Sequence, residues 1–545
     1  MIEDPRHRLD DRARGWLRYI WEKATTPDDW SIAGEPHPWW DRYSTPPLCS
    51  LARFDLHETG YVLPVMCDVT PAWREVYTRI ADELLGRYTT FWSVIDWVTM
   101  IGHDPDADRH PPEWLAYIPE HLRGRYDSPG WTANGIEPWG LQPDPIGSDG
   151  NLFFRGFLNL LLCFYRYVAG DDRWLRPFAV TGYQDRCFEW DHHRLVDFMH
   201  EQWKERPAGV HCENTKIWPF CLSGAGLGLQ LYDGLFTAST HGVFDRWVEY
   251  ARTHYMGLDR RGGVDWFAFY HDPLERTSLV LRDSLSAYAA LCIIPYVLPQ
   301  NREFATLLYE SSIRGLGWDD PRAPLLQLHP DPRWLVIALV VAREIGDRGT
   351  EERLRAVAER SFEPRAFGPD GDRFGWWFNL GEEYPRGQLA SLMMLSEIGE
   401  PGSWARVFTH PNLAKFDQPT VEGVDYPRLG IAQAWNDLDA GALWVETVAA
   451  TTAARGERTA WRVTGLPDAA SVAVQCDGSD FPAWRVVDPG SIELECEVGD
   501  RLYRIATGHH GDPSPRPEAA LRSSPAVPQR RVYVPASPGG SSCCG

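Results

Sequence analysis

Two cysteines nine residues apart stand in the most informative segment of the sequence, G-V-H-C-E-N-T-K-I-W-P-F-C. Cys212 is flanked by His211 and Glu213, and Cys221 closes the segment. A thiol can exchange protons or attack as a nucleophile, and a nearby imidazole or carboxylate can take up or supply the proton. The segment therefore offers four candidates for acid–base or nucleophilic catalysis.

A helix start inside this segment bears on the reactivity of Cys221. Pro219 lacks an N–H and has a fixed φ, so it suits the first turn of a helix. The pattern predicts a loop over residues 209–217 and a helix over about 218–235. A thiol in the first turns of a helix meets the positive end of the helix dipole, which lowers the thiol pKa. The structural alternative stays open, because a free cysteine often serves as a small buried hydrophobe.

Composition limits the classes of partner. The chain has 545 residues, of which 43% are hydrophobic, and a formal net charge of −22. That charge argues against nucleic acid and against anionic membrane surfaces as partners. The 26 Trp, 21 Tyr and 22 Phe residues can line a pocket for sugars, apolar ligands or cationic intermediates, or can fill a core.

The expected compartment follows from the N-terminus and the cysteines. The segment M-I-E-D-P-R-H-R is polar and charged, without the apolar stretch of an export signal. The sequence has no run of 18 apolar residues, so no membrane span is predicted. The eleven cysteines are odd in number and scattered, as expected of reduced thiols. We predict a cytoplasmic location.

The chain divides into four predicted regions: an N-terminal arm (1–71), a helical region (72–450), a small β accessory domain (451–511) and a disordered tail rich in Pro and Ser (512–545). The arm holds one predicted helix, at 12–24. The helical region predicts helices at 72–86, 152–168, 192–204, 222–236, 242–255, 278–297, 301–313, 333–346, 351–361, 387–398 and 432–450. Helices in this number, paired as hairpins, favour a mainly α fold and an (α/α)6 barrel.

Two predicted loops of the helical region are rich in glycine and aromatic residues, at 262–271 and 374–384. The segment 53–61, R-F-D-L-H-E-T-G-Y, is dense in ionisable and aromatic residues and is either a helix entry or a loop over a site. From Thr459 the hydrophobic pattern alternates, which predicts four or five strands in a small accessory sheet.

Three segments resemble the linalool dehydratase/isomerase family. They are H-C-E-N-T-K-I-W-P-F-C, the segment D-P-I-G-S-D-G-N-L-F-F-R-G-F-L-N-L from Asp144, and more weakly F-Y-H-D-P at 269–273. The resemblance covers about residues 70–400. It implies an (α/α)6 barrel and a reaction without cofactor or metal, in which water is removed from, or moved on, a tertiary or allylic terpene alcohol. Family members can build their pocket across subunits, which allows a homo-oligomer.

Matched residue by residue, the resemblance implies that Cys212 and Cys221 are the active-site thiols and that Tyr270 is an active-site tyrosine. Phe157 stands where the founding enzyme has a histidine, so another group has to replace that imidazole. The candidates are His211, His271, Glu213 and Glu383. The N-terminal Asp and Tyr of the family have no match here, only the sequence neighbours Asp41, Tyr43, Phe54 and Asp55.

Such a reaction needs a proton for the leaving hydroxyl, a base for the adjacent C–H and stabilisation of the cation between them. Cys221 is the predicted acid–base group, with Cys212 as its partner or as a transient nucleophile; Tyr270, Glu213 and His211 are further donors or acceptors. Aromatic faces stabilise a cation. The predicted substrate-binding residues are Phe153, Phe154, Phe157, Trp218, Trp266 and His271. We therefore predict a dehydratase, hydratase or proton-initiated cyclase for a small terpenoid or similar apolar alcohol or alkene.

Three other readings stay open. Asp265, Glu382 and Glu383 lie in Trp-rich loops, as the two carboxylates of a carbohydrate-active (α/α)6-barrel enzyme would. Cys212, Cys221 and a histidine could hold zinc, although their spacing is not that of a standard zinc knuckle. A non-catalytic binding protein would have a filled barrel with neither cysteine facing a pocket.

Overall fold

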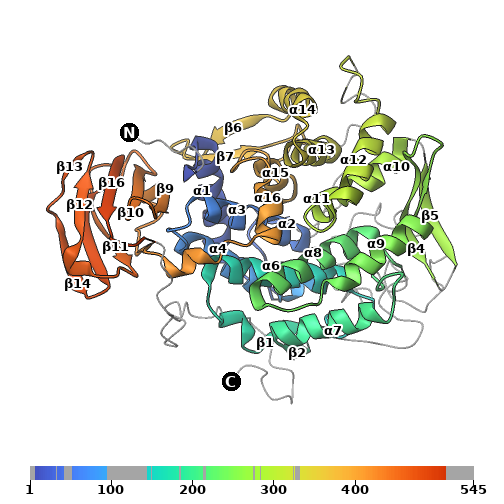
Figure 1. Cartoon of the computed structure of the whole chain (residues 1–545), viewed down its shortest axis with the longest axis horizontal. Coiled ribbons are helices and arrows are strands. Elements are labelled where there is room, and N and C mark those ends of the chain that lie inside the picture. Colours follow the sequence, from blue (N-terminus) through green and yellow to red (C-terminus); the bar gives the residue numbers. More distant parts are fainter. Residues whose placement is uncertain are drawn as a thin grey trace.

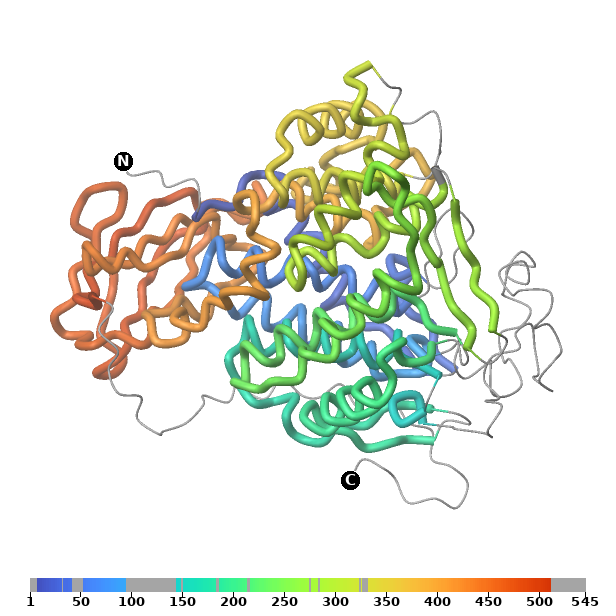
Figure 2. The backbone as a smooth tube through the Cα atoms, turned by 45° about the vertical axis from the view of Figure 1, so that its right-hand side comes forward, coloured from blue at the N-terminus to red at the C-terminus, as the bar shows by residue number. Residues whose placement is uncertain are grey.

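The computed structural model describes residues 7–31, 33–41, 52–94, 144–148, 150–182, 186–212, 216–273, 276–282, 284–322, 325 and 332–510. The helices and the C-terminal sheets lie at opposite ends of the longest axis (Figure 1). Figure 2 shows the same separation from another side. Glu213, Tyr43 and the predicted tail at 512–545 lie outside the described residues.

Helices make up most of the regular structure before residue 410, which confirms the mainly α class. They are α1 (Asp11–Thr25), α2 (Ala52–Thr59), α3 (Val62–Val69), α4 (Glu75–Tyr88), α6 (Leu152–Ala169), α7 (His192–Lys204), α8 (Pro219–Phe236), α9 (Gly242–His254), α10 (Ser284–Leu291), α11 (Ile294–Val297), α12 (Arg302–Gly315), α13 (Pro332–Ile345), α14 (Arg348–Ser361), α15 (Gly387–Leu395) and α16 (Ser403–Thr409). The closed (α/α)6 barrel stays a prediction.

The first helix belongs to this helical unit, so the described residues of the predicted N-terminal arm (1–71) are part of the helical core. Asp10 caps α1 by accepting the N–H of Ala13, and Trp16 and Ile20 on its apolar face are fully buried. Helix α2 packs against α15 and also contacts α6. The many prolines of this region separate helices that nevertheless join one core.

Helices α6 and α8 form the closest helix pair. A Cβ at Gly156 would lie 2.9 Å from Cβ of Ala225, and one at Gly228 would lie 2.7 Å from the side chain of Asn159. The contact positions advance along both helices together, so the helices run parallel and start at the same end. By length and composition α6 could cross a membrane, but 89% of its 18-residue window is buried inside the protein. This helix is part of the core.

Small antiparallel groups interrupt the helices: β1 (Phe178–Thr181) with β2 (Cys187–Trp190); β3 (Met256–Leu258), β4 (Val264–Asp272) and β5 (Thr277–Arg282); and β6 (Pro364–Phe367) with β7 (Arg373–Trp376). The predicted loop at 262–271 is therefore strand β4, and the loop at 374–384 begins within β7. A single helix at 278–297 is also wrong. Thr277–Arg282 pairs with β4, and α10 and α11 follow it, because cross-strand pairing with an aromatic strand outweighs the apolar helical spacing.

The C-terminal unit is a pair of sheets that begins at Thr420, not at residue 451. Trp461 of β11 packs edge-on against Tyr503 of β16, with ring centroids 5.4 Å apart, so the sheets meet face to face. The sheet orders are β13-β12-β16-β10-β9 and β14-β15-β11-β8. The strands are β8 (Thr420–Glu422), β9 (Leu429–Asp437), β10 (Ala442–Ala449), β11 (Arg458–Thr464), β12 (Ala473–Cys476), β13 (Ser479–Asp480), β14 (Trp484–Asp488), β15 (Ser491–Glu497) and β16 (Arg501–Ala506).

The predicted helix at 432–450 is the hairpin of β9 and β10. Its turn ends at Gly441, whose φ of 56° a helix does not use. Burial then alternates along β10, which a helix would not produce.

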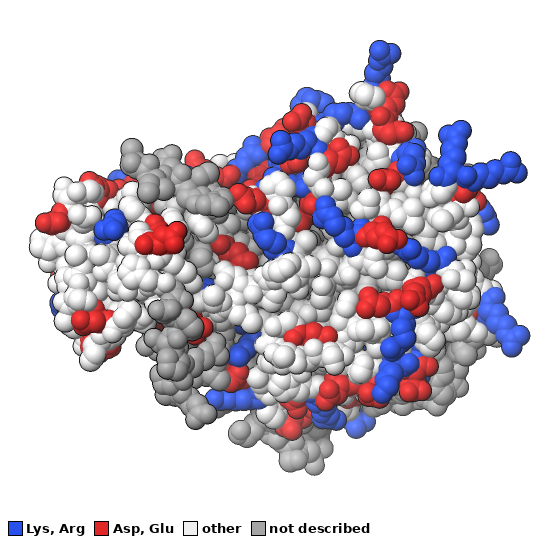
Figure 3. Space-filling view, viewed as in Figure 1, with Lys and Arg blue, Asp and Glu red and all other residues white. Residues whose placement is uncertain are grey.

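On the face drawn in Figure 3, Lys and Arg side chains lie among Asp and Glu side chains. The described part of this face carries no broad surface of one charge. Such a mixed surface gives a polyanion no extended region to bind.

Candidate active site

The thiol-bearing segment is tied at both ends to secondary structure. The Leu152 N–H at the start of α6 donates to the His211 carbonyl at 3.3 Å. The Cys212 N–H donates to the Lys216 carbonyl at 2.6 Å, and Ile217 exchanges two backbone hydrogen bonds with His271 of β4. The segment therefore links the N-terminus of α6 to the end of β4 and fixes the backbone around Cys212.

The sulfur of Cys212 lies at the N-terminus of α6. It accepts the backbone N–H of Phe153 at 3.2 Å and is buried. Its surroundings are therefore a backbone N–H and the positive end of the α6 dipole. The sequence predicted this environment for Cys221, which indeed lies in the first turn of α8, begun by Pro219. Because α6 and α8 are parallel, both thiols lie at the same end of the pair.

Tyr88, the last residue of α4, lies within electrostatic reach of both thiols. Burial raises its pKa, Arg53 lowers it, and Cys212 and Cys221 raise it further. The Tyr88 side chain is fully buried, and its hydroxyl has no hydrogen-bond partner among the described residues. A phenol and two thiols thus share one buried environment.

Aromatic rings form a continuous cluster next to the thiols. Phe153 contacts Phe157 at 4.6 Å and Phe54 at 4.5 Å between ring centroids. Phe157 contacts Phe220 at 5.7 Å and Tyr296 at 5.8 Å. A Cβ at Gly224 would lie 2.4 Å from the Phe157 ring, so glycine is what lets this ring approach α8. Two of the predicted wall residues, Phe153 and Phe157, therefore form the centre of the cluster.

The cluster also holds an imidazole from α2. The His57 ring stacks on Phe157 with centroids 4.1 Å apart and an interplanar angle of 18°. Its Nδ1 lies 2.7 Å from the Tyr61 hydroxyl, which lies 2.9 Å from the Tyr296 hydroxyl. Burial and the nearby Arg53 hold the pKa of His57 well below 6.5, so the ring is neutral at pH 7.

Glu58 is a buried carboxyl next along α2. Burial raises its pKa well above 4.5, although Arg333 and Gln388 lower it. The sequence did not single out His57 and Glu58 as site residues. The sequence signal for them was the density of ionisable and aromatic residues at 53–61. In the structure most of this segment is helix α2, which contacts α6.

Tyr270 packs beside the start of α8 rather than in the ring cluster. Its ring lies 4.9 Å from Trp218, the residue before Pro219, and burial raises the pKa of its phenol. Lys216 lies 6.0 Å over the Tyr270 ring. Trp218 and Tyr270 therefore contact each other, outside the ring cluster.

Two other predicted residues face elsewhere. Trp266 packs over Gly257 of the neighbouring strand β3, where a Cβ would lie 2.0 Å from the indole nitrogen. His271 Nδ1 lies 2.9 Å from the Ser278 hydroxyl on β5, and burial lowers its pKa. Both residues lie on β4, which pairs with β3 on one side and with β5 on the other.

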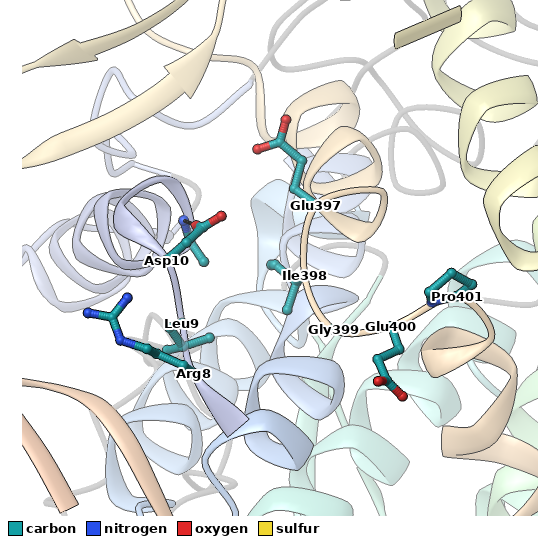
Figure 4. A pocket seen from close by; sticks show the side chains of 9 residues that line it. Arg8, Leu9, Asp10, Glu397, Ile398, Gly399, Glu400 and Pro401 are labelled. Atoms are coloured by element: carbon teal, nitrogen blue, oxygen red, sulfur yellow. Dashed lines mark hydrogen bonds between the residues drawn. The ribbon is translucent and has the colours of Figure 1, made fainter. Parts of the chain in front are cut away.

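A separate pocket of about 400 Å³ lies between the start of α1 and the segment after α15 (Figure 4). Its lining residues are Arg8, Leu9, Asp10, Ala13, Glu397, Ile398, Gly399, Glu400 and Pro401. Burial raises the pKa of Glu397 to about 7, and Arg12 pairs with its carboxylate at 3.2 Å. None of the predicted site residues lines this pocket, and we locate the candidate site by its chemistry, at the thiols.

The three carboxylates of the carbohydrate alternative lie at or near the surface, two of them in ion pairs. The Asp265 side chain is 59% exposed and 4.0 Å from Arg282. Glu382 pairs with Arg386 at 2.8 Å, and Glu383 is exposed. For the zinc alternative, the described residues contain no group of three His, Cys, Asp or Glu side chains that could hold one metal ion. Neither alternative gains a site in this part of the chain.

Comparison with known proteins agrees with the thiol segment. Residues 131–373 match the family model of linalool dehydratase/isomerase, a range that includes both thiols, Phe157 and Tyr270. Among solved structures, a polysaccharide lyase matches at 12% identity over 72% of this chain and 96% of its own, with a TM-score of 0.32. A GH127 β-arabinofuranosidase matches at 10% identity over 90% of this chain and 74% of its own, with a TM-score of 0.23. A GH127 β-L-arabinofuranosidase from Geobacillus stearothermophilus T6 matches at 11% identity over 90% and 80%, with a TM-score of 0.19.

Proposed function

We propose that this protein, whose central 243 residues (131 to 373) match linalool dehydratase/isomerase, is a cofactor-independent lyase or isomerase of apolar alcohols or alkenes. The substrate class is a terpenoid or a similar small apolar alcohol. The reaction is dehydration, hydration or proton-initiated cyclisation. The observation that carries the proposal is the pair of buried thiols at the starts of two parallel helices, next to an aromatic cluster.

The chemistry divides among these groups. A thiol of the pair protonates the leaving hydroxyl, so that the C–O bond breaks with release of water. The thiolate that results is stabilised by the helix N-terminus, as the Phe153 N–H does for Cys212. The rings of Phe153 and Phe157 stabilise the allylic cation. Loss of a proton from the neighbouring carbon then gives the alkene.

Turnover by single thiol variants tests this proposal. Linalool and other tertiary and allylic terpenoid alcohols are offered to the wild type, Cys212→Ala and Cys221→Ala, with formation of alkene or isomer as the readout. Each thiol variant should lose about 10²–10⁴-fold in kcat, the usual contribution of a positioned acid or base. Cys496→Ala in the C-terminal sheets is the matched control, expected within about twofold of wild type.

Two results contradict the proposal. One is wild-type turnover that survives in both thiol variants. The other is turnover of oligosaccharides, with no activity on any apolar alcohol.

A further inference from the structure

The buried imidazole of His57 has one nitrogen without a hydrogen-bond partner in the part of the chain that the structure describes. Nδ1 is bonded to Tyr61, whereas Nε2 has no hydrogen-bond partner among the described residues. The residue is fully buried. Buried polar atoms are nearly always hydrogen-bonded, so an exception in a reactive cluster points to a function.

We propose that Nε2 of His57 is the base that takes the carbon-bound proton in the reaction of this site. This inference rests on the proposed function and adds to it a catalytic residue outside the matched range 131–373.

The position of the ring fits this role. His57 stacks on Phe157 at 4.1 Å and meets the Phe153 ring at 5.4 Å. The N–H of Phe153 holds the sulfur of Cys212. The imidazole is therefore separated from a thiol by one aromatic residue, and a substrate cation bound against these rings would lie beside both groups.

Two phenols hold the ring in a usable form. When Nδ1–H donates to the Tyr61 hydroxyl and Tyr61 donates to Tyr296, both of these hydrogen bonds have one donor and one acceptor. In this arrangement Nε2 keeps its lone pair. Tyr61 and Tyr296 are in this sense positioning residues. The hydrogen bond at Nδ1 sets which ring nitrogen carries the proton, as the bond to the non-reacting nitrogen of a catalytic histidine commonly does.

The surrounding charges keep the base neutral before reaction. Arg53 and Glu58 accompany His57 on α2, Tyr61 follows directly before α3 and is bonded to Tyr296 of α11, and α6 presents the rings of Phe153 and Phe157. Burial and Arg53 lower the pKa of His57, whereas burial raises the pKa of the Glu58 carboxyl. A neutral imidazole therefore meets the substrate at pH 7.

The step balances without a further reactant. The thiol proton leaves with the hydroxyl as water, and Nε2 accepts the proton of the adjacent C–H bond. The electron pair of that bond forms the C=C bond. The imidazolium then returns its proton to the thiolate, which restores both groups.

A ring exchange tests the proposal, because the two rings stack face to face. His57→Phe removes the base and should lower kcat on linalool, or on whichever terpenoid alcohol the wild type converts, about 10²–10⁴-fold. Adding Phe157→His to that variant returns an imidazole to the same cluster and should restore at least about tenfold. His193→Phe is the matched control: its Nδ1 lies 2.6 Å from the Tyr232 hydroxyl, outside the cluster, and its loss should leave kcat within about twofold.

Circular dichroism and thermal unfolding confirm that each variant is folded. Folded His57→Phe with wild-type kcat overturns the proposal, and so does a folded exchange variant that is no more active than His57→Phe. Deuterium uptake from D₂O into recovered substrate is a second readout, which should stop in His57→Phe while KM changes little. Failure of the proposed function gives a different result. In that case the wild type and the thiol variants alike convert no terpenoid alcohol.

Discussion

Two regions of this molecule each place a tyrosine between two cysteines, and they use the arrangement differently. In the C-terminal sheets, Tyr503 hydrogen-bonds to Cys496 and Cys476, so all three polar groups are partnered. In the helical unit, Tyr88 lies within reach of Cys212 and Cys221, but its hydroxyl is unpartnered among the described residues and the Cys212 sulfur bonds to the start of α6. The same residue types make a packed core in one place and a candidate site in the other.

One ion pair from each region shows a similar contrast in burial. In the sheets the pair of Arg501 and Asp477 is exposed, with side chains 53% and 46% exposed. In the helical unit Lys23 and Asp55 pair at 2.6 Å with neither side chain exposed. A candidate reactive site is thus recognised by buried polar groups that have no partner among the described residues. The residue types alone do not identify it.

The largest expected effect concerns these ion pairs. Lys23→Met leaves the Asp55 carboxylate buried without its cation, which should cost about 3–5 kcal/mol of unfolding free energy. Arg501→Met removes an exposed partner and should cost at most about 1 kcal/mol. Urea unfolding of the two variants measures both. Equal losses would mean that the burial contrast between the regions has no energetic consequence.

Acidity should act on the two regions with opposite signs. Burial raises the pKa of Glu58, so its contribution to stability is complete below its unfolded value of 4.5 and is lost as pH rises through the folded value. The Leu502 N–H and Arg501 lower the pKa of Asp477, so its contribution is complete above 3.8 and is lost as pH falls.

Melting temperatures between pH 4 and 8 test these signs. Glu58→Gln should match wild type near pH 4 and exceed it near pH 8, because the amide never has to ionise in the core. Asp477→Asn should fall below wild type at neutral pH and approach it on acidification. A Glu58→Gln variant that is less stable than wild type at pH 8 would show that Glu58 is charged in the fold.

The sequence predicted those parts of the site that depend on local order. Pro219 marked the start of α8, and the match around Cys212 and Cys221 identified the thiol segment. Hydrophobic periodicity located most of the helices. It misassigned 278–297 and 432–450, where pairing with a neighbouring strand decided between helix and strand.

The contacts between distant segments could not be predicted in this way. His57 and Phe157 are 100 residues apart in the sequence, yet their rings stack, and the N-terminus that binds the Cys212 sulfur is that of α6 and not of α8. Nothing in the residues around 53–61 states which other helix they face. The residues that the sequence offers in place of the missing histidine, His211, His271, Glu213 and Glu383, therefore all lie near the motifs or the Trp-rich loops and not on α2.

A smaller effect is expected from the glycine that admits the Phe157 ring. Gly224→Ala would put a methyl group 2.4 Å from that ring and should destabilise by about 1–3 kcal/mol through overpacking. Gly490→Ala in the sheets meets its nearest atom at 3.6 Å and should change stability by less than about 0.5 kcal/mol. If Gly224→Ala unfolds like wild type, the ring cluster has room that the close packing of α6 and α8 does not suggest.

The smallest effect is expected from the loss of one hydroxyl in each region, which tests directly whether Tyr88 and Tyr503 differ in their partners. Tyr503→Phe removes a hydroxyl bonded to two thiols and should cost about 1 kcal/mol. Tyr88→Phe removes a buried hydroxyl without a partner among the described residues, so it should be neutral or stabilising by about 1 kcal/mol. Thermal unfolding of the pair gives the two signs directly. A destabilising Tyr88→Phe would mean that this phenol is partnered in the folded protein, and the thiol end of α6 and α8 would then be a packed core like the one around Tyr503.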